Sequence, residues 1–579
     1  MMRIPGWVKG IMVGMYFFLL AILFTYPLIT MMSTRIIGQP GDNIYYAWVI
    51  GWVKKAVFDL QVNPLNVWFL NYPEGWNLAF TEIAPVQVLI GLPFALLVNP
   101  LFGYNLSMLS TYVLSGIFMF LWIRSVTGKN GVALIAGTAF ATLPYHQAHF
   151  LAGHLNVSAI QWFPLYFWAL FEILKSEPVK HRVKFSLVAG AALGLIGLAS
   201  MYYLYMTLLV TLIVLVINVF FVRKGIFRWQ YWSSFLWMGL MALPLMVAAI
   251  WPFFSLENQV SMPERDISVV RLLAASASPL DYILPATDHF AVGSWVNQHF
   301  NRQMWIENTL YLGFVPLIFA VIGGIALKKT DRRLTILVLA VILFSWLLSL
   351  GLDLFLNGER VQVQLPGFLA NLFNRTETFI PLPGLLLFKY LPFYDRMRSF
   401  ARFGIFVMLF IQVMMAYGLS FIWENARPRL ARAGLTILIL LAVLAEFYPG
   451  QYRQSFSAEG RPVDSWLAGQ KDDGAVIQFP IEQEEEQDLV YATLIHGKPF
   501  VGGAFSSFPP QQYQEIKPIL EKFPDASSAA LLDQLDVTYV IADADVYGSD
   551  AGFISTCEGL GLVFVDKIGD ELVFINQKE

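Results

Sequence analysis

Residues 203–222 read YLYMTLLVTLIVLVINVFFV, a run of twenty residues without a charged side chain. A helix of this length spans the hydrocarbon core of a bilayer, which is about 30 Å thick. Inside that core the backbone finds no water to bond with, so a crossing segment of this kind is helical. The run therefore predicts a membrane-spanning helix.

Eleven stretches in all have the length and the apolar character of a span, or nearly so. They lie at about 11–31, 105–123, 131–147, 155–174, 185–201, 203–222, 232–253, 309–327, 334–352, 402–423 and 431–449. Of the 579 residues, 57% are hydrophobic and only 14% are charged, against about 25% charged residues in soluble proteins. We expect a polytopic α-helical membrane protein with about eleven spans.

The segment 84–102 is also apolar, but three prolines interrupt it. Lys and Arg collect in cytoplasmic loops, and five short loops are basic, at 124–129, 175–184, 223–228, 328–333 and 427–432. They share a side with Arg3 and Lys9 only if 84–102 does not cross, so we expect this segment to be re-entrant or interfacial. The N-terminus is then cytoplasmic, and four segments lie outside: 32–104, 254–308, 353–401 and the tail from residue 450.

The tail differs from the rest in charge and in periodicity. Residues 450–579 hold 8 basic and 22 acidic residues, a net charge of −14, which leaves +11 for residues 1–449. Runs such as VTYVIAD and GLVFVDKIGDELVFI predict strands, and EIKPILEKF and SSAALLDQL predict short helices. We expect a small extracytoplasmic α/β domain that stabilises the core or gathers substrate, with the acidic run EQEEEQD (482–488) as a solvated loop.

Asp42 is the first residue that could carry chemistry. It lies in IIGQPGDNIYYAWVIGW (36–52), just outside the first predicted span and before an apolar helical pattern. As an N-cap it would start that helix. As a carboxylate at the membrane surface it could act as a general base towards an acceptor hydroxyl. The residues alone leave both interpretations open.

The order of these parts resembles that of the GT-C superfamily of glycosyltransferases. GDNIYYAWVIGW, IENTLYLGFVPL, LPFYDRMRSFARFGIF, HGKPFVGG and LDVTYVI further resemble stretches of YfhO-like and related bacterial GT-C membrane proteins. The resemblance covers most of the chain. It implies a GT-C fold, a polyprenyl-phosphate-linked sugar donor and Asp42 as the catalytic aspartate of loop one. Asn43 stands where many members carry a second acidic residue.

Three of the seven histidines occur within nine residues, in PYHQAHFLAGHL (144–155). They are His146, His149 and His154, and the first two are i,i+3 neighbours on one helix face. Such histidines could bind a divalent metal, contact the substrate or simply anchor the span at the interface. The sequence identifies no further ligand, so the presence and the kind of metal stay open.

Arg396, Arg398 and Arg402 gather where an outer loop enters the tenth predicted span. The positive-inside rule does not explain them on that face. Their planar guanidinium groups suit the phosphate of a departing donor, although such side chains also reach lipid headgroups. Glu307 and Glu82, just outside apolar helices, are further candidates for substrate binding, or complement helix dipoles.

These patterns predict a glycosyltransferase at the outer face of the cytoplasmic membrane. Residues 1–449 form its transmembrane domain, and the acceptor is a glycan, a glycolipid or a protein. A transporter or flippase of lipid-linked sugars, which would favour inverted repeats, and a non-catalytic scaffold are the alternatives. The single Cys557 excludes a disulfide framework, and no basic cluster indicates nucleic-acid binding.

Overall fold

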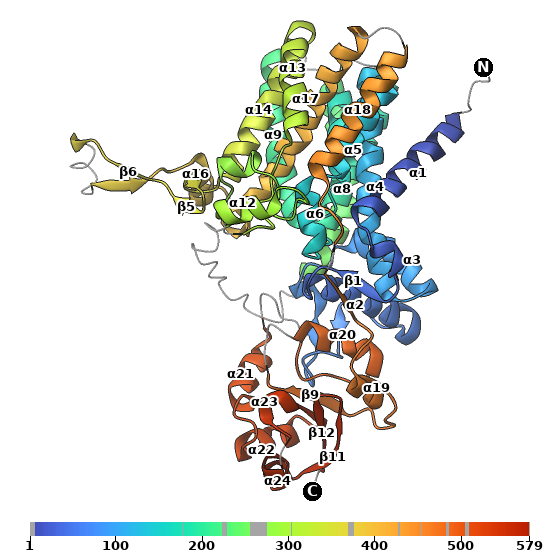
Figure 1. The fold of residues 1–579 in the computed structure, drawn as a ribbon, viewed down its shortest axis with the longest axis vertical. Coiled ribbons are helices and arrows are strands. Elements are labelled where there is room, and N and C mark those ends of the chain that lie inside the picture. Colours follow the sequence, from blue (N-terminus) through green and yellow to red (C-terminus); the bar gives the residue numbers. More distant parts are fainter. Residues whose placement is uncertain are drawn as a thin grey trace.

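The computed structural model describes residues 6–175, 178–222, 229–254, 275–302, 304–368, 376–425, 429–452, 454–481, 486–503, 509–549 and 551–577. A bundle of long helices forms one end of the molecule, and a small α/β unit forms the other (Figure 1). The elements of the first loop lie between these two parts.

Eight described helices are long and apolar enough to cross a membrane. They are α1 (Gly6–Phe24), α4 (Pro100–Thr127), α8 (Val179–Ala199), α9 (Met201–Val222), α10 (Trp229–Phe254), α14 (Arg332–Ser349), α17 (Gly404–Asn425) and α18 (Arg429–Phe447). The shorter helices α5 (Asn130–Ala141), α7 (Trp162–Ile173) and α13 (Phe314–Thr330) occupy the other predicted spans. The protein is therefore a multi-pass helical membrane protein, as predicted.

One predicted span, 131–147, is broken. Helix α5 ends at Ala141, and α6 (Pro144–Leu151) begins only at Pro144. Proline has no backbone N–H and clashes with the preceding turn, so it fits the first turn of a new helix and not the middle of an old one. The break redirects the chain and turns α6 into the protein interior, where nearly all of it is buried.

Helix α3 (Pro85–Leu97) occupies the segment expected to be re-entrant or interfacial. Its 13 residues extend about 20 Å, less than the bilayer core. It lies against α4 at Gly91 and Gly103, where a Cβ on either glycine would come within 2.7 Å of the other's carbonyl oxygen. This contact needs two residues without side chains.

The C-terminal unit contains a four-stranded sheet in the order β11-β12-β10-β9. Its strands are β9 (Ala475–Phe479), β10 (Val537–Asp543), β11 (Leu562–Ile568) and β12 (Glu571–Asn576), of which β9 and β10 are parallel. Its helices are α19 (Pro462–Ala468), α20 (Glu486–His496), α21 (Gln511–Leu520), α22 (Ala526–Gln534), α23 (Ala544–Tyr547) and α24 (Ala551–Glu558). The predicted α/β character is confirmed.

The acidic run 482–488 is only partly the loop that we expected. Helix α20 begins inside it at Glu486, and residues 482–485 lie outside the described residues.

The first loop and the C-terminal unit are joined at several places. Strand β1 (Arg35–Ile37) pairs antiparallel with β8 (Ser455–Ser457). Helix α2 (Asp42–Lys54) packs against α20. The N–H groups of Asn71 and Tyr72 donate to carbonyl oxygens of Gly502 and Phe500 at 3.0 and 3.1 Å. Loop one is therefore held from two sides, by the bundle and by the tail.

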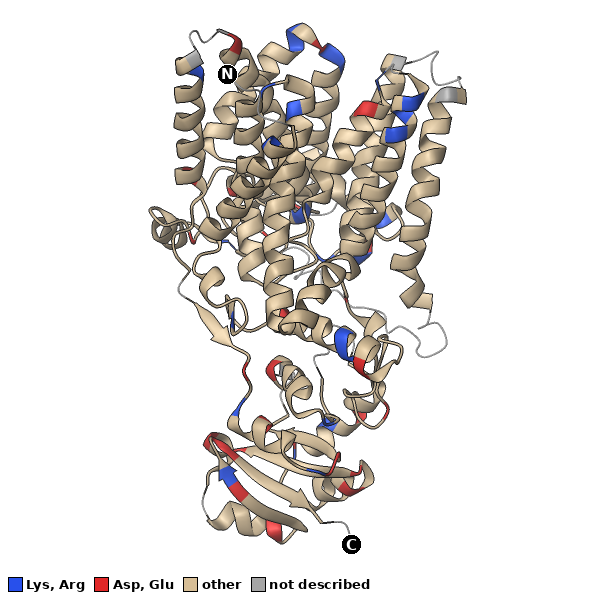
Figure 2. Ribbon diagram, turned by 90° about the vertical axis from the view of Figure 1, so that its right-hand side faces the viewer, with Lys and Arg blue, Asp and Glu red and all other residues tan. Residues whose placement is uncertain are grey.

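The described fold also contains several small helices and strand pairs, besides short 3-10 helical turns and one π-helical turn after α2. They are α12 (Gly293–His299), α16 (Pro383–Tyr390) and the strand pairs β2 (Asn66–Val67) with β3 (Trp76–Asn77), β4 (Phe355–Leu356) with β5 (Glu359–Arg360), and β6 (Gln362–Gln364) with β7 (Glu377–Phe379). Lys and Arg gather at the end of the bundle that points away from the C-terminal unit, as Figure 2 shows. We call this the basic end.

Candidate functional site

Asp42 is the first residue of α2, and Gly41 takes the N-cap position. The predicted N-cap role of Asp42 is therefore wrong, although its charge still complements the N-terminus of the helix. The side chain is 47% exposed, and its Oδ2 lies 3.6 Å from Nε2 of His154. Asp42 thus combines access from water with a close imidazole.

Two glycines bring the segment of His154 against the start of α2. Gly153 has φ +73°, and a Cβ there would lie 2.4 Å from the Cβ of Asn43. Gly38 has φ +104°, and its Cβ would lie 2.2 Å from the carbonyl oxygen of Leu151. Only glycine adopts these backbone angles freely and leaves room for such contact.

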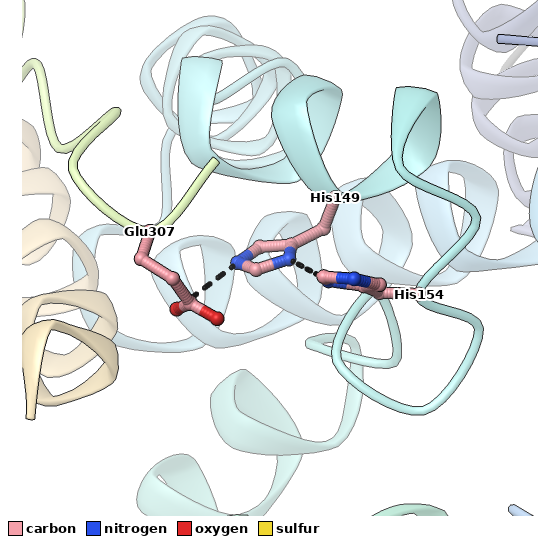
Figure 3. A group of neighbouring side chains, drawn as sticks. All are labelled: His149, His154 and Glu307. Carbon is pink, nitrogen blue, oxygen red and sulfur yellow. Dashed lines mark hydrogen bonds and ion pairs between the residues drawn. The ribbon is translucent and has the colours of Figure 1, made fainter. Parts of the chain in front are cut away.

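His154, His149 and Glu307 form a row (Figure 3). Asp42 lies at the His154 end of this row. Nδ1 of His154 and Nδ1 of His149 are 2.8 Å apart. Nε2 of His149, on α6, lies 4.0 Å from Oε2 of Glu307. His149 and Glu307 are buried, so the row connects an exposed carboxylate with a buried one.

Arg402 and Ser399 hold Glu307 in place. Nε and Nη2 of Arg402 donate to Oε1 at 3.0 and 2.5 Å, and the Ser399 hydroxyl donates to Oε2 at 3.0 Å. Burial alone would raise the pKa of Glu307, but the charge and the hydrogen bonds of Arg402 overcome it and lower the pKa to about 2. Glu307 is therefore a carboxylate at neutral pH.

Burial keeps the two imidazoles neutral. It lowers the pKa of His149 well below its ordinary value, although the charge of Glu307 opposes the shift. Burial lowers the pKa of His154 as well, against the opposing charge of Asp42.

The two neutral histidines carry too few N–H groups to donate both to each other and to the two neighbouring carboxylates. Two neutral imidazoles carry two N–H groups, and the bond between the Nδ1 atoms uses one of them. A single N–H remains for two Nε2 atoms, of which one faces Asp42 and the other faces Glu307. At one end a nitrogen lone pair therefore faces a carboxylate, which favours a proton, a hydroxyl group or a cation there.

Hydrogen-bonded side chains form the wall beside this row. Asn156 donates to the Glu82 carboxylate. The Tyr145 ring stands edge-on to His149 with 4.4 Å between the centroids, and its hydroxyl lies 2.9 Å from that of Tyr203. Asn156, Tyr145, Tyr203 and Ser399 were not predicted, because neutral polar and aromatic residues are common near membrane interfaces and carry no signal of their own.

Comparison with solved structures identifies the architecture. An oligosaccharyltransferase from Archaeoglobus fulgidus in its apo form matches with a TM-score of 0.51 at 14% identity, over 99% of this chain and 75% of the other. ArnT from Cupriavidus metallidurans matches with a TM-score of 0.50, over 99% of both chains, in the apo state at 11% identity and bound to undecaprenyl phosphate at 9%. The chain has the GT-C fold. No protein-family model and no curated protein sequence matches it.

Within this GT-C fold, most of the predicted site residues lie together. Asp42, His149, His154, Glu307 and Arg402 form one connected group. Glu82 belongs to the adjoining wall because Asn156 donates to it. Besides burial, the charges of Glu82 and Asp42 both help to raise the pKa of Tyr46.

His146 and Arg396 lie outside this group. Nε2 of His146 bonds the Thr111 hydroxyl at 2.8 Å, Nδ1 bonds the Ala141 carbonyl at 2.9 Å, and the ring stacks on Tyr112. Both ring nitrogens of His146 are thus bonded within the protein. The Arg396 side chain is 61% exposed and pairs with the adjacent Asp395.

The other two predicted arginines differ in their surroundings. Arg398 is half-buried. Arg402 is paired with Glu307, and its guanidinium also lies over the Tyr202 ring, 5.7 Å from the centroid. Arg402 is thus paired with a carboxylate of this chain.

The row of side chains fits a divalent metal ion. His149, His154 and Glu307 each offer one ligand atom, and these atoms lie within 4.8 Å of one another. Two histidines and one glutamate form a known catalytic zinc set. Nε2 of His149 is buried without a hydrogen-bond partner, so it can donate its lone pair to a cation. Arg402 competes for Glu307, so a metal here would share that carboxylate.

Proposed function

We propose that this chain is a glycosyltransferase that moves a sugar from a polyprenyl-phosphate-linked donor to an acceptor hydroxyl. The observation that carries the proposal is Asp42, a half-exposed carboxylate beside an imidazole at the loop-one end of a GT-C fold. ArnT bound to undecaprenyl phosphate supplies the class of donor. The basic end of the bundle then faces the cytoplasm, and the reaction takes place at the outer surface.

Asp42 acts as the general base in this proposal. The acceptor hydroxyl gives its proton to the Asp42 carboxylate, and its oxygen forms a bond to the anomeric carbon from the face opposite the phosphate. The bond between that carbon and the phosphate oxygen breaks, and the polyprenyl phosphate leaves with the electron pair. The configuration at the sugar is inverted.

The neighbouring residues position these groups. His154 holds Asp42 at one end of the row, and Arg402 fixes Glu307 at the other. Arg398, which is half-buried where the outer loop enters α17, carries the contact to the donor phosphate. Glu82, with Asn156, faces hydroxyl groups of the sugar. A divalent metal held by His149, His154 and Glu307 would supply positive charge beside the leaving phosphate.

The test measures sugar transfer in proteoliposomes. Hexose- and pentose-linked undecaprenyl phosphates are supplied as donors, together with extracted envelope glycans, glycolipids and proteins as acceptors. Asp42→Asn is expected to lower kcat by about 10²–10⁴ with the donor KM unchanged. Arg398→Ala is expected to raise the donor KM.

Asp395→Asn, which changes an exposed carboxylate near Arg396, is the matched control and keeps full turnover. Wild-type turnover in Asp42→Asn would end the role of that residue. A wild-type chain that transfers none of these sugars would contradict the proposed activity.

A further inference from the structure

A cavity of about 240 Å³ lies at the basic end of the bundle, away from Asp42. Its walls come from the last turns of α4 and α7, the first two turns of α14 and part of α17. These are the ends of membrane helices, so the cavity lies at the level where hydrocarbon gives way to headgroups. None of the groups used in the proposed reaction lines it.

The inner part of this cavity is apolar. Trp122 and Phe171 stack with 6.2 Å between their ring centroids. Leu337, Val338 and Val413 line it as well, and all three are buried. A surface of this kind suits a hydrocarbon chain, because the free energy falls when the chain displaces water from it.

The rim of the cavity carries charges of both signs. Lys175 and Arg333 supply two cations, and Glu172 and Asp331 supply two anions. A ligand that complements all four contains a negative and a positive group.

Bonds to the protein hold these rim groups in place. Nζ of Lys175 lies 2.5 Å from Oε1 of Glu172. Arg333 donates from Nη2 to the Leu174 carbonyl at 2.9 Å and from Nε to Asn218 at 3.1 Å. Oδ1 of Asp331 accepts from the N–H of Leu334 at 2.9 Å and so caps α14. The rim is therefore preorganised, which reduces the entropic cost of binding.

We propose that this cavity binds one phospholipid with an ethanolamine headgroup. The phosphate contacts Arg333 and Lys175, the ammonium group donates hydrogen bonds to Asp331, and one acyl chain lies on the apolar surface. A glycerol headgroup has no cation for the acidic groups. A choline headgroup has a cation that cannot donate a hydrogen bond. Basic pockets between membrane helices are known lipid sites. In this cavity the two acidic side chains, Glu172 and Asp331, favour an ethanolamine headgroup over a glycerol headgroup.

Native mass spectrometry tests the proposal on the full chain, purified in detergent and freed of lipid. Phosphatidylethanolamine, phosphatidylglycerol and phosphatidylcholine with the same acyl chains are offered in equal amounts. The wild-type chain is expected to retain one phosphatidylethanolamine with about tenfold preference, equal to about 1.4 kcal/mol. Equal retention of the three lipids would overturn the proposal.

Asp331→Asn is the decisive variant. Asparagine caps a helix as well as aspartate does, so the fold is kept while the anion is lost. We expect the variant to retain phosphatidylethanolamine and phosphatidylglycerol about equally. An unchanged preference for phosphatidylethanolamine would refute the contact between its ammonium group and Asp331. Lys389→Ala, at the other end of the bundle, is the control and leaves retention as in the wild type.

Two further measurements separate the headgroup from the acyl chain. Leu337→Trp fills the apolar part, and at an unchanged melting temperature it is expected to abolish retention. Soluble glycerophosphoethanolamine in tenfold excess is expected not to displace the lipid. Full displacement by this headgroup alone would contradict the part assigned to the acyl chain.

Discussion

Glu307 and Arg402 cannot be removed independently of each other. The carboxylate receives the Arg402 guanidinium and the Ser399 hydroxyl in a buried site. Removing one half of a buried ion pair leaves an uncompensated charge, which costs about 3–5 kcal/mol, whereas replacing both halves with apolar side chains is often tolerated.

Glu307→Gln is therefore expected to lower the free energy of unfolding by about 3–5 kcal/mol. The measurement is thermal and denaturant unfolding of the purified chain in detergent. The double variant Glu307→Leu with Arg402→Met is expected to regain most of this stability. Glu424→Gln, which removes an exposed partner of Lys129, is the control and changes stability by less than about 1 kcal/mol. Wild-type stability of Glu307→Gln would show that the pair is not a unit.

The row of histidines leads to a prediction about metal binding. Titration calorimetry of the chelator-treated chain with Zn²⁺ is expected to show one site. His149→Ala is expected to weaken it at least tenfold, because a ligand is lost. His146→Asn keeps the site, since His146 is bonded elsewhere. Equal affinity in wild type and His149→Ala would place any bound zinc outside this row.

The sequence predicts most of the charged residues of the site. It does not predict which neighbour each side chain faces. Asp42, Glu307 and Arg402 stand out in the sequence because each is an ionisable residue at the edge of an apolar helix, in a stretch that resembles GT-C proteins. His146 and His149 were expected to share a helix face. Helix α6 has only eight residues and is buried almost all round, so each ring meets a different neighbour.

At the scale of elements, α2 is the part that positions Asp42. Every residue from Asn43 to Trp52 is buried, under α3, α4 and α20. Nε1 of Trp48 donates to the Thr493 hydroxyl at 3.1 Å. A Cβ on Gly51 would lie 2.4 Å from Leu494. One wall of this helix thus belongs to the C-terminal unit.

Thr493→Val is expected to impair turnover although it lies far from Asp42 in sequence. It leaves the buried Trp48 N–H unpaired, which costs about 1–3 kcal/mol, and loosens α2. We expect a several-fold lower kcat with little change in donor KM, and rescue by Thr493→Ser. Thr556→Val, on an exposed helix of the same unit, is the control. Kinetics of Thr493→Val equal to those of the wild type would argue against this role of α20.

The elements were largely predictable because their signals are local. Long apolar runs and β-branched runs mark the spans and the strands. Two features could not be predicted from the sequence, for physical reasons. The break before Pro144 lies inside a continuous apolar run, and the pairing of β1 with β8 joins residues 420 positions apart. Neither hydropathy nor periodicity records such a contact.

At the scale of the whole molecule, charge divides the two ends. The described Lys and Arg residues gather at one end of the bundle, and the C-terminal unit, within a tail of net charge −14, lies at the other (Figure 2). The site group shares the end of the C-terminal unit, since α2 packs on α20.

This arrangement predicts how a membrane-impermeant maleimide labels single-cysteine variants in a Cys557→Ser background. Asp42→Cys and Arg396→Cys are expected to react in intact cells. Lys175→Cys is expected to react only after permeabilisation. The Lys175 side chain is 47% exposed, so the reagent can reach this position once it has entered the cell. Labelling of positions 42 and 396 from opposite sides would contradict the placement of both outer loops on one face of the membrane.

The pairing of β1 with β8 also has a consequence for biosynthesis. The ribosome makes Arg35 about 420 residues before Ser455, which at about 5–20 residues per second is a delay of about 20–80 s. During that interval β1 is without its partner strand. The first loop therefore cannot complete its contact with the C-terminal unit until translation is nearly finished, and a chain that ends before Ser455 would lack this contact.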